Sequence, residues 1–270
     1  MLTDMQQTII ITGASSGFGR ATAELLAARG HRVYGLCRRP MEHPSIRYRQ
    51  CDVRNRDQIR SVVDAIVADE GRVDVLINNA GMGIGGALEL ATDEEIDLQM
   101  GTNFMGCVLM CQTVLPHMRR AKNGKIINLS SIGGVMGLPY QGFYSASKFA
   151  IEGFSEALAA EVKSFGIRVC LVEPGDFATG FTSSRRNSQA TLDDPAYGPL
   201  FSRTLALIEK EENGGLKPEV LARRIVRLVE RRRPPLRSVV SNLEQWLSVV
   251  LKRILSGNQM VSVLRSYYKC

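Results

Sequence analysis

A phenol and an ammonium group stand four residues apart in the stretch FYSASKFAIEGF, residues 143–154. In a helix Tyr144 and Lys148 would share one face, with their Cβ atoms about 5–6 Å apart. A positive charge ~5 Å from a phenol, at an effective dielectric constant of ~20, is worth roughly 3 kcal/mol, or about two pKa units. Lys148 could thus bring the pKa of Tyr144 from about 10 to near 8, which suits proton transfer near neutrality. The alternative is that two exposed side chains meet at this spacing by chance.

Strand-like and helix-like segments alternate along the chain that must position this pair. Apolar or β-branched runs predict strands at 8–12, 31–37, 46–51, 73–78, 124–130, 166–175 and 236–241. Helical stripes are predicted at 19–30, 59–67, 94–121 and 218–233, and in the segment that carries Tyr144. This order is typical of an α/β protein, so we predict a single domain, residues 1–270, with a Rossmann-like doubly wound parallel sheet and helices on both faces.

Glycines punctuate the turn between the first strand and the first helix. Gly13, Gly17 and Gly19 follow the spacing G-x-x-x-G-x-G. Glycine permits a tight turn and lets the backbone approach a pyrophosphate at the helix N-terminus. Two further loops, 51–53 (CDV) and 78–81 (NNAG), follow the third and fourth strands. Ligands of open α/β sheets bind at the carboxyl ends of strands, so these loops indicate a nucleotide site rather than simple turns.

The motifs TGASSGFG, NNAG, TNFMG, SS at 130–131, YSASK and PG at 174–175 together resemble the short-chain dehydrogenase/reductase family over about residues 7–180. The stretch MGLPYQGFYSASKFAIEGF is particularly similar to the hydroxysteroid and retinol dehydrogenase branch. The resemblance implies an oxidoreductase in which Tyr144 is the acid/base and Lys148 its partner. It also implies that Ser131 binds the substrate oxygen and that Asn103 holds a water in a proton relay. By sequence alone Ser130 competes with Ser131.

The resemblance and the glycine turn together give a set of residues that would contact a nicotinamide dinucleotide. They are Gly13, Ser15, Ser16, Gly17, Phe18, Gly19, Arg38, Arg39, Asp52, Val53, Asn79, Ala80, Gly81, Tyr144, Lys148, Pro174, Gly175, Phe177 and Thr179.

The end of the second strand bears on the choice of cofactor. NAD-preferring relatives carry an acid there, which binds the ribose hydroxyls. In this sequence Cys37 stands at that place, and Arg38 and Arg39 follow. An arginine fork can pair with a 2′-phosphate, so we predict NADP(H), with Ser15 or Ser16 as a further hydroxyl donor. Two merely solvated arginines are the alternative.

The composition restricts the remaining possibilities. Apolar residues make up 44% and charged residues 23% of the chain, as in soluble proteins, and no apolar run approaches the ~20 residues of a membrane span. The N-terminus lacks the pattern of a signal peptide, so we expect a cytoplasmic protein. The spacing of histidines and cysteines predicts no metal site and no disulfide framework. The net charge of +7 comes from residues 217–270, which hold 12 Lys and Arg against three acids, but no motif there indicates nucleic-acid binding.

We expect three parts of the chain to have different roles. Residues 7–175 would form the cofactor-binding and catalytic core, 176–216 a substrate lid, and 217–270 a helix, the last strand and an amphipathic segment. In that segment an apolar stripe at helical spacing is predicted, formed by Leu243, Trp246, Leu247, Val250, Leu251 and Ile254. Packing on the protein's own core is the favoured interpretation of this stripe. A lid over the substrate and contact with a membrane surface stay open.

The expected activity is therefore NADP(H)-dependent interconversion of a carbonyl and an alcohol on a small apolar substrate, such as a steroid, a retinoid or a lipid. A non-catalytic nicotinamide-sensing or scaffold protein on the same fold is the main alternative. A lipid-surface protein with a vestigial site and a sugar-nucleotide epimerase are two others. We expect a homodimer or homotetramer, with Ala157, Ala160 and Val162 suited to close helix packing.

Overall fold

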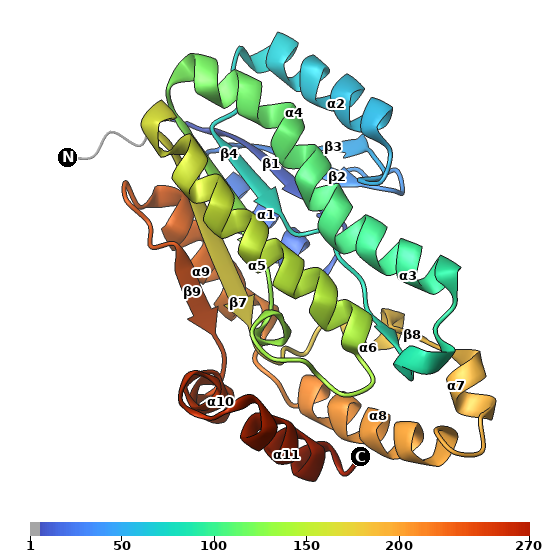
Figure 1. The fold of residues 1–270 in the computed structure, drawn as a ribbon. Coiled ribbons are helices and arrows are strands. Elements are labelled where there is room, and N and C mark those ends of the chain that lie inside the picture. The colour runs from blue at the N-terminus through green and yellow to red at the C-terminus, as the bar shows by residue number, and fades with distance from the viewer. Residues whose placement is uncertain (1–5) are drawn as a thin grey trace.

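Seven parallel strands form the central sheet, in the order β3-β2-β1-β4-β6-β7-β9, in the computed structural model, which describes residues 6–270 (Figure 1). The strands are β1 (Thr8–Thr12), β2 (Arg32–Cys37), β3 (Ile46–Gln50), β4 (Val75–Asn78), β6 (Gly124–Leu129), β7 (Ile167–Pro174) and β9 (Arg237–Val240). Two further strands of two residues each, β5 (Ile84–Gly85) and β8 (Arg186–Asn187), pair outside this sheet. The predicted α/β fold with one parallel sheet is confirmed.

Helices cover both faces of the sheet. They are α1 (Gly17–Ala28), α2 (Arg56–Glu70), α3 (Asp93–Met100), α4 (Gly106–Ala121), α5 (Gly142–Val162), α6 (Phe181–Ser184), α7 (Gln189–Asp193), α8 (Gly198–Asn213), α9 (Pro218–Glu230), α10 (Leu243–Ile254) and α11 (Gly257–Tyr268). Ile10 joins one apolar cluster with residues of α2, α4 and α5. Ile9 and Ile11 join a second cluster with α1 and α9. The alternation arises because successive side chains of a strand point to opposite faces.

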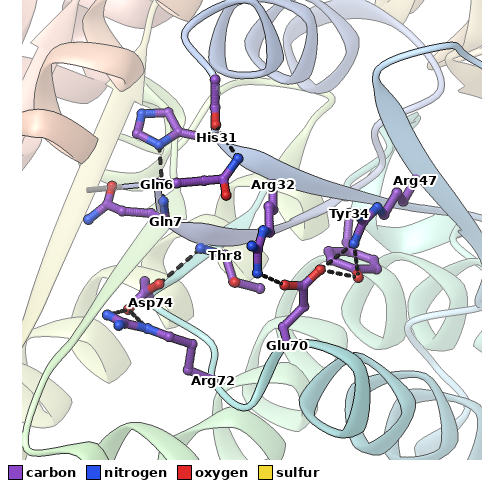
Figure 2. Close-up of polar contacts among 11 residues, drawn as sticks. Gln6, Gln7, Thr8, His31, Arg32, Tyr34, Arg47, Glu70, Arg72 and Asp74 are labelled. Carbon is purple, nitrogen blue, oxygen red and sulfur yellow. Dashed lines mark hydrogen bonds and ion pairs between the residues drawn. The ribbon is translucent and has the colours of Figure 1, made fainter. Parts of the chain in front are cut away.

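Ion pairs hold together the amino-terminal edge of the sheet (Figure 2). Glu70, at the end of α2, pairs with Arg32 and Arg47 and accepts a hydrogen bond from the hydroxyl of Tyr34 at 2.8 Å. Asp74 accepts from the backbone N–H of Thr8 at 2.9 Å. These contacts belong to the edge opposite the predicted ligand loops. The ion pairs at the amino-terminal edge of the sheet and the predicted ligand loops at its carboxyl-terminal edge are thus separated by the length of the strands.

The C-terminal helices α10 and α11 lie beyond the carboxyl-terminal edge of the sheet, beside α8 (Figure 1). Each contributes one buried side chain, Val249 from α10 and Met260 from α11, and both pack with Met136 of the loop after β6. The favoured expectation that the α10 stripe packs on the core is wrong, because Leu243 is 73% exposed and Ile254 74% exposed. Among residues 6–270 no helix is long and apolar enough to cross a bilayer.

Candidate active site

Tyr144 and Lys148 occupy the first two turns of α5, as the spacing predicts. Lys148 Nζ lies 5.7 Å from the centre of the Tyr144 ring and donates a hydrogen bond to the carbonyl of Leu129, the last residue of β6, at 2.8 Å. Burial lowers the pKa of Lys148 to about 8. Burial also raises the pKa of Tyr144 to about 12. The expectation that Lys148 holds the pKa of Tyr144 near 8 is therefore wrong for the protein alone, since desolvation of the phenolate outweighs the nearby charge.

Ser131 is brought to Tyr144 by the turn that follows β6. Its Oγ accepts from the backbone N–H of Gly133 at 3.0 Å. A hydrogen bond between Ser131 and Tyr144 works against the burial that raises the phenol's pKa. Ser130, the competing candidate, is buried, and its Oγ has no hydrogen-bond partner among residues 6–270. The geometry therefore favours Ser131 over Ser130 as the serine beside Tyr144.

Asn103 lies in a π-helical turn, Gly101–Met105, that joins α3 to α4. Such turns are frequent at functional sites because the wider turn redirects side chains. The Asn103 amide accepts from the N–H of Met82 at 2.9 Å and donates to Ser147 Oγ at 3.0 Å. A Cβ on Gly81 would lie 3.5 Å from Asn103 Oδ1 and 3.8 Å from Lys148 Nζ. Gly81 therefore lies beside both the Asn103 amide and the Lys148 ammonium group.

The glycine turn has the shape that a dinucleotide needs. Gly13 and Gly17 have φ angles of 64° and 51°, in the left-handed region that favours glycine. Asn79 fixes the turn, because its Nδ2 donates to the carbonyl of Thr12 at 2.9 Å and to that of Gly13 at 3.1 Å. The neighbouring Ala80 donates its N–H to Thr12 Oγ1 at 2.9 Å. The NNAG loop therefore supports the glycine turn from behind.

The start of α1 is open to an anion. Ser16 is the N-cap of α1, yet its side chain caps no backbone N–H, and the first turn carries no acid. The first N–H groups of a helix favour a phosphate when no side chain satisfies them. Ser15 and Gly19 lie in the same turn. Phe18 packs edge-on against Phe177 at 4.9 Å between ring centres. The residues present thus fit a pyrophosphate at this helix end.

The carboxyl ends of β2 and β3 hold the other predicted cofactor residues. Arg38 and Arg39 are exposed. The last residue of β2 is Cys37, at the position where an NAD-preferring relative would carry a carboxylate. Asp52 is hydrogen-bonded to Arg54, which holds the pKa of Asp52 below its usual range, and Arg38 contributes to the same effect. Val53 is buried against Gly106, where a Cβ would lie 2.7 Å from its methyl group. Val53 therefore packs against the start of α4, behind the loop of residues 51–53.

One cavity of about 430 Å³ connects the residues of the proposed chemistry. Its polar end is lined by Ser131, Tyr144, Lys148 and, at the end of β7, Pro174 and Gly175. Thr179 lines it too, with its Oγ1 accepting from the N–H of Phe181 at 3.1 Å. Its far wall is apolar and comes from α10 and α11. The apolar wall is formed by Leu247, Leu251, Met260, Val263 and Leu264.

A carboxylate that the sequence reasoning missed stands in this cavity. Asp176 follows Gly175 directly, and its Oδ2 accepts from Gln245 Nε2 of α10 at 2.5 Å. Within residues 6–270, Asp176 Oδ1 makes no hydrogen bond. Burial, together with the charges of Glu212 and Glu211, raises the pKa of Asp176 to about 7.

The charges around Asp176 do not balance. Glu212 is ion-paired with Arg185, whose side chain is 2% exposed. Glu211 accepts a hydrogen bond from the hydroxyl of Tyr267 on α11. The three carboxylates of Asp176, Glu211 and Glu212 therefore have a single guanidinium, that of Arg185, among the groups around Asp176. A cationic group placed beside Asp176 would relieve this excess of negative charge.

Comparison with known proteins gives consistent matches. The profile that describes short chain dehydrogenases matches residues 7–190. A 3-ketodihydrosphingosine reductase of Bacteroides thetaiotaomicron is 56% identical over 97% of this chain and 98% of its own. Retinol dehydrogenase 8 of Bos taurus is 33% identical over 87% of this chain and 82% of its own. A solved short-chain dehydrogenase from Streptomyces avermitilis superposes with a TM-score of 0.83 at 31% identity, covering 98% of this chain and 97% of that one.

Proposed function

The chain belongs to the short-chain dehydrogenase/reductase family, and from this membership we propose that it reduces the ketone of a 3-keto sphingoid base, or of a close long-chain amino ketone, with NADPH. The relative that is 56% identical is a reductase of such a ketone, which supports the substrate class. In 3-ketodihydrosphingosine a long alkyl chain leaves one side of the carbonyl, and the carbon on the other side carries an amine.

One observation carries this proposal: a single cavity holds Tyr144, the carboxylate of Asp176 and an apolar wall. The three parts match the three parts of the substrate, namely the carbonyl, the ammonium group and the alkyl chain. A steroid or a retinoid would use the apolar wall but would leave Asp176 with the neutral Gln245 amide as its hydrogen-bond donor and no cation on its other oxygen. Burying an unpaired charge is costly, so a cationic substrate fits this cavity better than a neutral one.

The protonation states suit the direction of reduction. Tyr144 keeps its proton near neutral pH because its pKa is about 12, so it can donate that proton to the carbonyl oxygen. Lys148, with a pKa of about 8, is still largely charged at pH 7 and would stabilise the tyrosinate that forms. The Ser131 hydroxyl would donate a hydrogen bond to the same substrate oxygen. Asn103 would hold the water through which Tyr144 regains its proton.

A nicotinamide cofactor held by the residues at the strand ends would supply the hydride for the carbonyl carbon. Gly13, Ser15, Ser16, Gly17 and Gly19 would hold its pyrophosphate at the start of α1, and Asp52 and Val53 would border its adenine end. Asn79, Ala80 and Gly81 would line the ribose, which Lys148 would also contact. Pro174, Gly175, Phe177 and Thr179 would line the nicotinamide. Arg38 and Arg39 are exposed beside the position where a 2′-phosphate would lie, which supports NADPH over NADH.

The test is an NADPH-oxidation assay with three carbonyl compounds: a 3-keto sphingoid base, the same ketone without its amine, and the aldehyde retinal. We expect Asp176→Asn to lower kcat/KM for the amino ketone by about ten- to a hundredfold, since a charge-assisted hydrogen bond is worth roughly 1.5–3 kcal/mol. The amine-free ketone should be reduced at the same rate by the wild-type enzyme and by Asp176→Asn. Tyr144→Phe should abolish turnover of all three compounds and leave NADPH binding intact.

Glu209→Gln provides the matched control, because Glu209 lies on α8 outside the cavity and the substitution removes the same charge. It should leave all three rates unchanged. Faster reduction of retinal than of the amino ketone by the wild-type enzyme would contradict the proposed substrate. Activity within about tenfold of wild type in Tyr144→Phe would contradict the proposed chemistry, because a positioned acid usually contributes 10²–10⁴.

A further inference from the structure

Large apolar side chains are exposed together on the C-terminal helices. Of the 14 large apolar residues that are exposed in the described chain, eight lie on α10 and α11. The outermost are Leu243 (73% exposed), Ile254 (74%) and Val261 (64%), with Trp246 at 48%. We call this group of four the C-terminal face. Exposed apolar patches of this kind mark interaction sites in soluble proteins.

The C-terminal face is exposed and lies outside the lining of the cavity. Leu243, Trp246 and Ile254 follow helical spacing along one side of α10. Val249, the one buried residue of α10, packs against Met136 and Met260. None of the face's four residues lines the cavity, so nothing bound in the cavity covers the C-terminal face. Its cover must come from outside the chain's own cavity.

The charges of the same two helices indicate what covers it. Lys252, Arg253, Arg265 and Lys269 stand there against a single acid, Glu244. A helix with Trp and Leu on one side and Lys and Arg nearby is suited to the boundary between lipid headgroups and acyl chains. We propose that the C-terminal face docks on the surface of an anionic lipid bilayer. The contact is peripheral, since no helix among residues 6–270 is long and apolar enough to span one.

A second copy of the chain is a poorer occupant. In a symmetric dimer the same patch meets itself. Four cations on each partner would then face four on the other, with one acid on each side to compensate. An anionic bilayer surface instead attracts each of these cations, with about 1 kcal/mol per Lys or Arg, which corresponds to roughly fivefold in partitioning.

The docked face is continuous with the mouth of the cavity. Leu247, Leu251, Val263 and Tyr267 line the cavity, and each is more than 40% exposed. These four residues form an apolar rim between the cavity and the C-terminal face. If the proposed function holds, the alkyl chain of the substrate can pass from the bilayer into the cavity without crossing water. Docking itself rests on the exposed residues and charges, not on the substrate.

Vesicle flotation of the full-length protein tests the docking directly, with no substrate or cofactor present. Vesicles of phosphatidylcholine alone are compared with vesicles that also contain phosphatidylglycerol. Trp246 is the only tryptophan of the chain, so its emission reports on the C-terminal face without other signals. We expect flotation with the anionic vesicles, a blue shift of the Trp246 emission, and quenching by lipids brominated near the headgroup.

Two variants of the face should weaken the binding. Leu243→Ser with Ile254→Ser removes the two most exposed apolar side chains, neither of which lines the cavity. Lys252→Glu with Arg253→Glu reverses two charges. Each pair should lower partitioning by at least about tenfold. Detergent-dispersed ketone should be turned over by the Leu243→Ser, Ile254→Ser variant at the wild-type rate.

Arg232→Glu with Arg233→Glu is the matched control for charge. Both arginines are exposed, and they precede β9 at its amino end, opposite the C-terminal helices. This control should bind vesicles nearly as well as the wild type. Three results would each overturn the proposal: no flotation with anionic vesicles, equal loss in the control pair, or a wild-type oligomer that becomes monomeric in the Leu243→Ser, Ile254→Ser variant. A failure of the proposed activity would leave flotation unaffected, so the two proposals fail separately.

Discussion

Asp176 and Lys148 line one cavity, and burial brings both of their pKa values close to neutrality, to about 7 and about 8. Burial moves both groups toward their neutral forms, upward for the acid and downward for the amine. Asp176 faces Glu211 and Glu212 of α8, Arg185 before β8 and Gln245 of α10. In the proposed reaction Asp176 must be ionised to bind an ammonium group, and Lys148 must be protonated to stabilise the tyrosinate.

The rate of reduction should therefore depend on pH in a predictable way. We expect kcat/KM for the amino ketone to rise as pH increases through about 7, because Asp176 loses its proton there. It should fall above about 8, because Lys148 then loses its charge. Asp176→Asn should remove the rise and keep the fall, as measured by initial rates across pH. If kcat/KM still rises through about pH 7 in Asp176→Asn, the rise comes from the titration of another group.

Arg38 tests the choice of cofactor at the same scale. Arg38→Ala should weaken NADPH by about ten- to a hundredfold and leave NADH nearly unchanged, since one charge-assisted hydrogen bond to the 2′-phosphate is lost. Fluorescence titration of each cofactor measures this. Cys37→Asp combined with Arg38→Ala should reverse the preference. Equal weakening of both cofactors would make Arg38 a support of the fold. A selective loss in Arg39→Ala alone would move the contact by one residue.

Single elements differ in how much of them the sequence could reveal. The strands of the central sheet begin and end within two residues of the predicted ranges, because buried strands are continuous apolar runs. Helix α8 lies in the stretch 176–216, for which the sequence predicted a substrate lid and no helix. Two of its buried positions, Thr204 and Glu212, are polar, so its apolar stripe is weak.

In the candidate site, some residues could be predicted from local motifs, whereas others depend on elements that are distant in the sequence. Tyr144, Lys148, Ser131 and Asn103 come together as the motifs predict, because each motif lies close to an element end that faces the cavity. Asp176 belongs to no motif. Its place in the site depends on α8 and α10, which follow it by tens of residues and contribute Glu212 and Gln245. The burial that raises the pKa of Tyr144 likewise comes from the assembled fold.

The β1–α1 turn provides a test at the scale of an element. A Cβ on Gly19 would overlap the carbonyl oxygen of Gly13, which is backbone and cannot move aside cheaply. Gly19→Ala should lower stability by about 1–3 kcal/mol and weaken both NADPH and NADH. Thermal unfolding and cofactor titration measure the two effects. In the control Gly257→Ala the added Cβ meets no atom within 4 Å, so stability and cofactor binding should be kept. Unchanged binding in Gly19→Ala would contradict the dinucleotide site.

At the scale of the whole molecule, we propose that two copies associate through α4 and α5. Phe149 of α5 and Met105 before α4 are each 44% exposed, and Ala157 and Ala160 of α5 are exposed as well. The expected part of Val162 in this contact is wrong, because Val162 is 5% exposed and belongs to the core.

Light scattering at micromolar concentration should give a homodimer or homotetramer, and Phe149→Glu should reduce its mass by placing a charge in the contact. Leu192→Glu, a comparable change on α7, should not. A wild-type monomer would contradict the proposed association.

The position of α10 and α11 after the last strand has a consequence for how such an enzyme can change its substrate over evolutionary time. These helices contribute two buried side chains and no strand to the sheet, so substitutions in them cost the fold little. They nevertheless supply one apolar wall of the cavity, with Leu247, Leu251, Met260, Val263 and Leu264. The family profile ends at residue 190, well before them. Selection can therefore rewrite the last helices for a new substrate while the cofactor site, fixed by interlocking glycines and strand ends, is inherited unchanged.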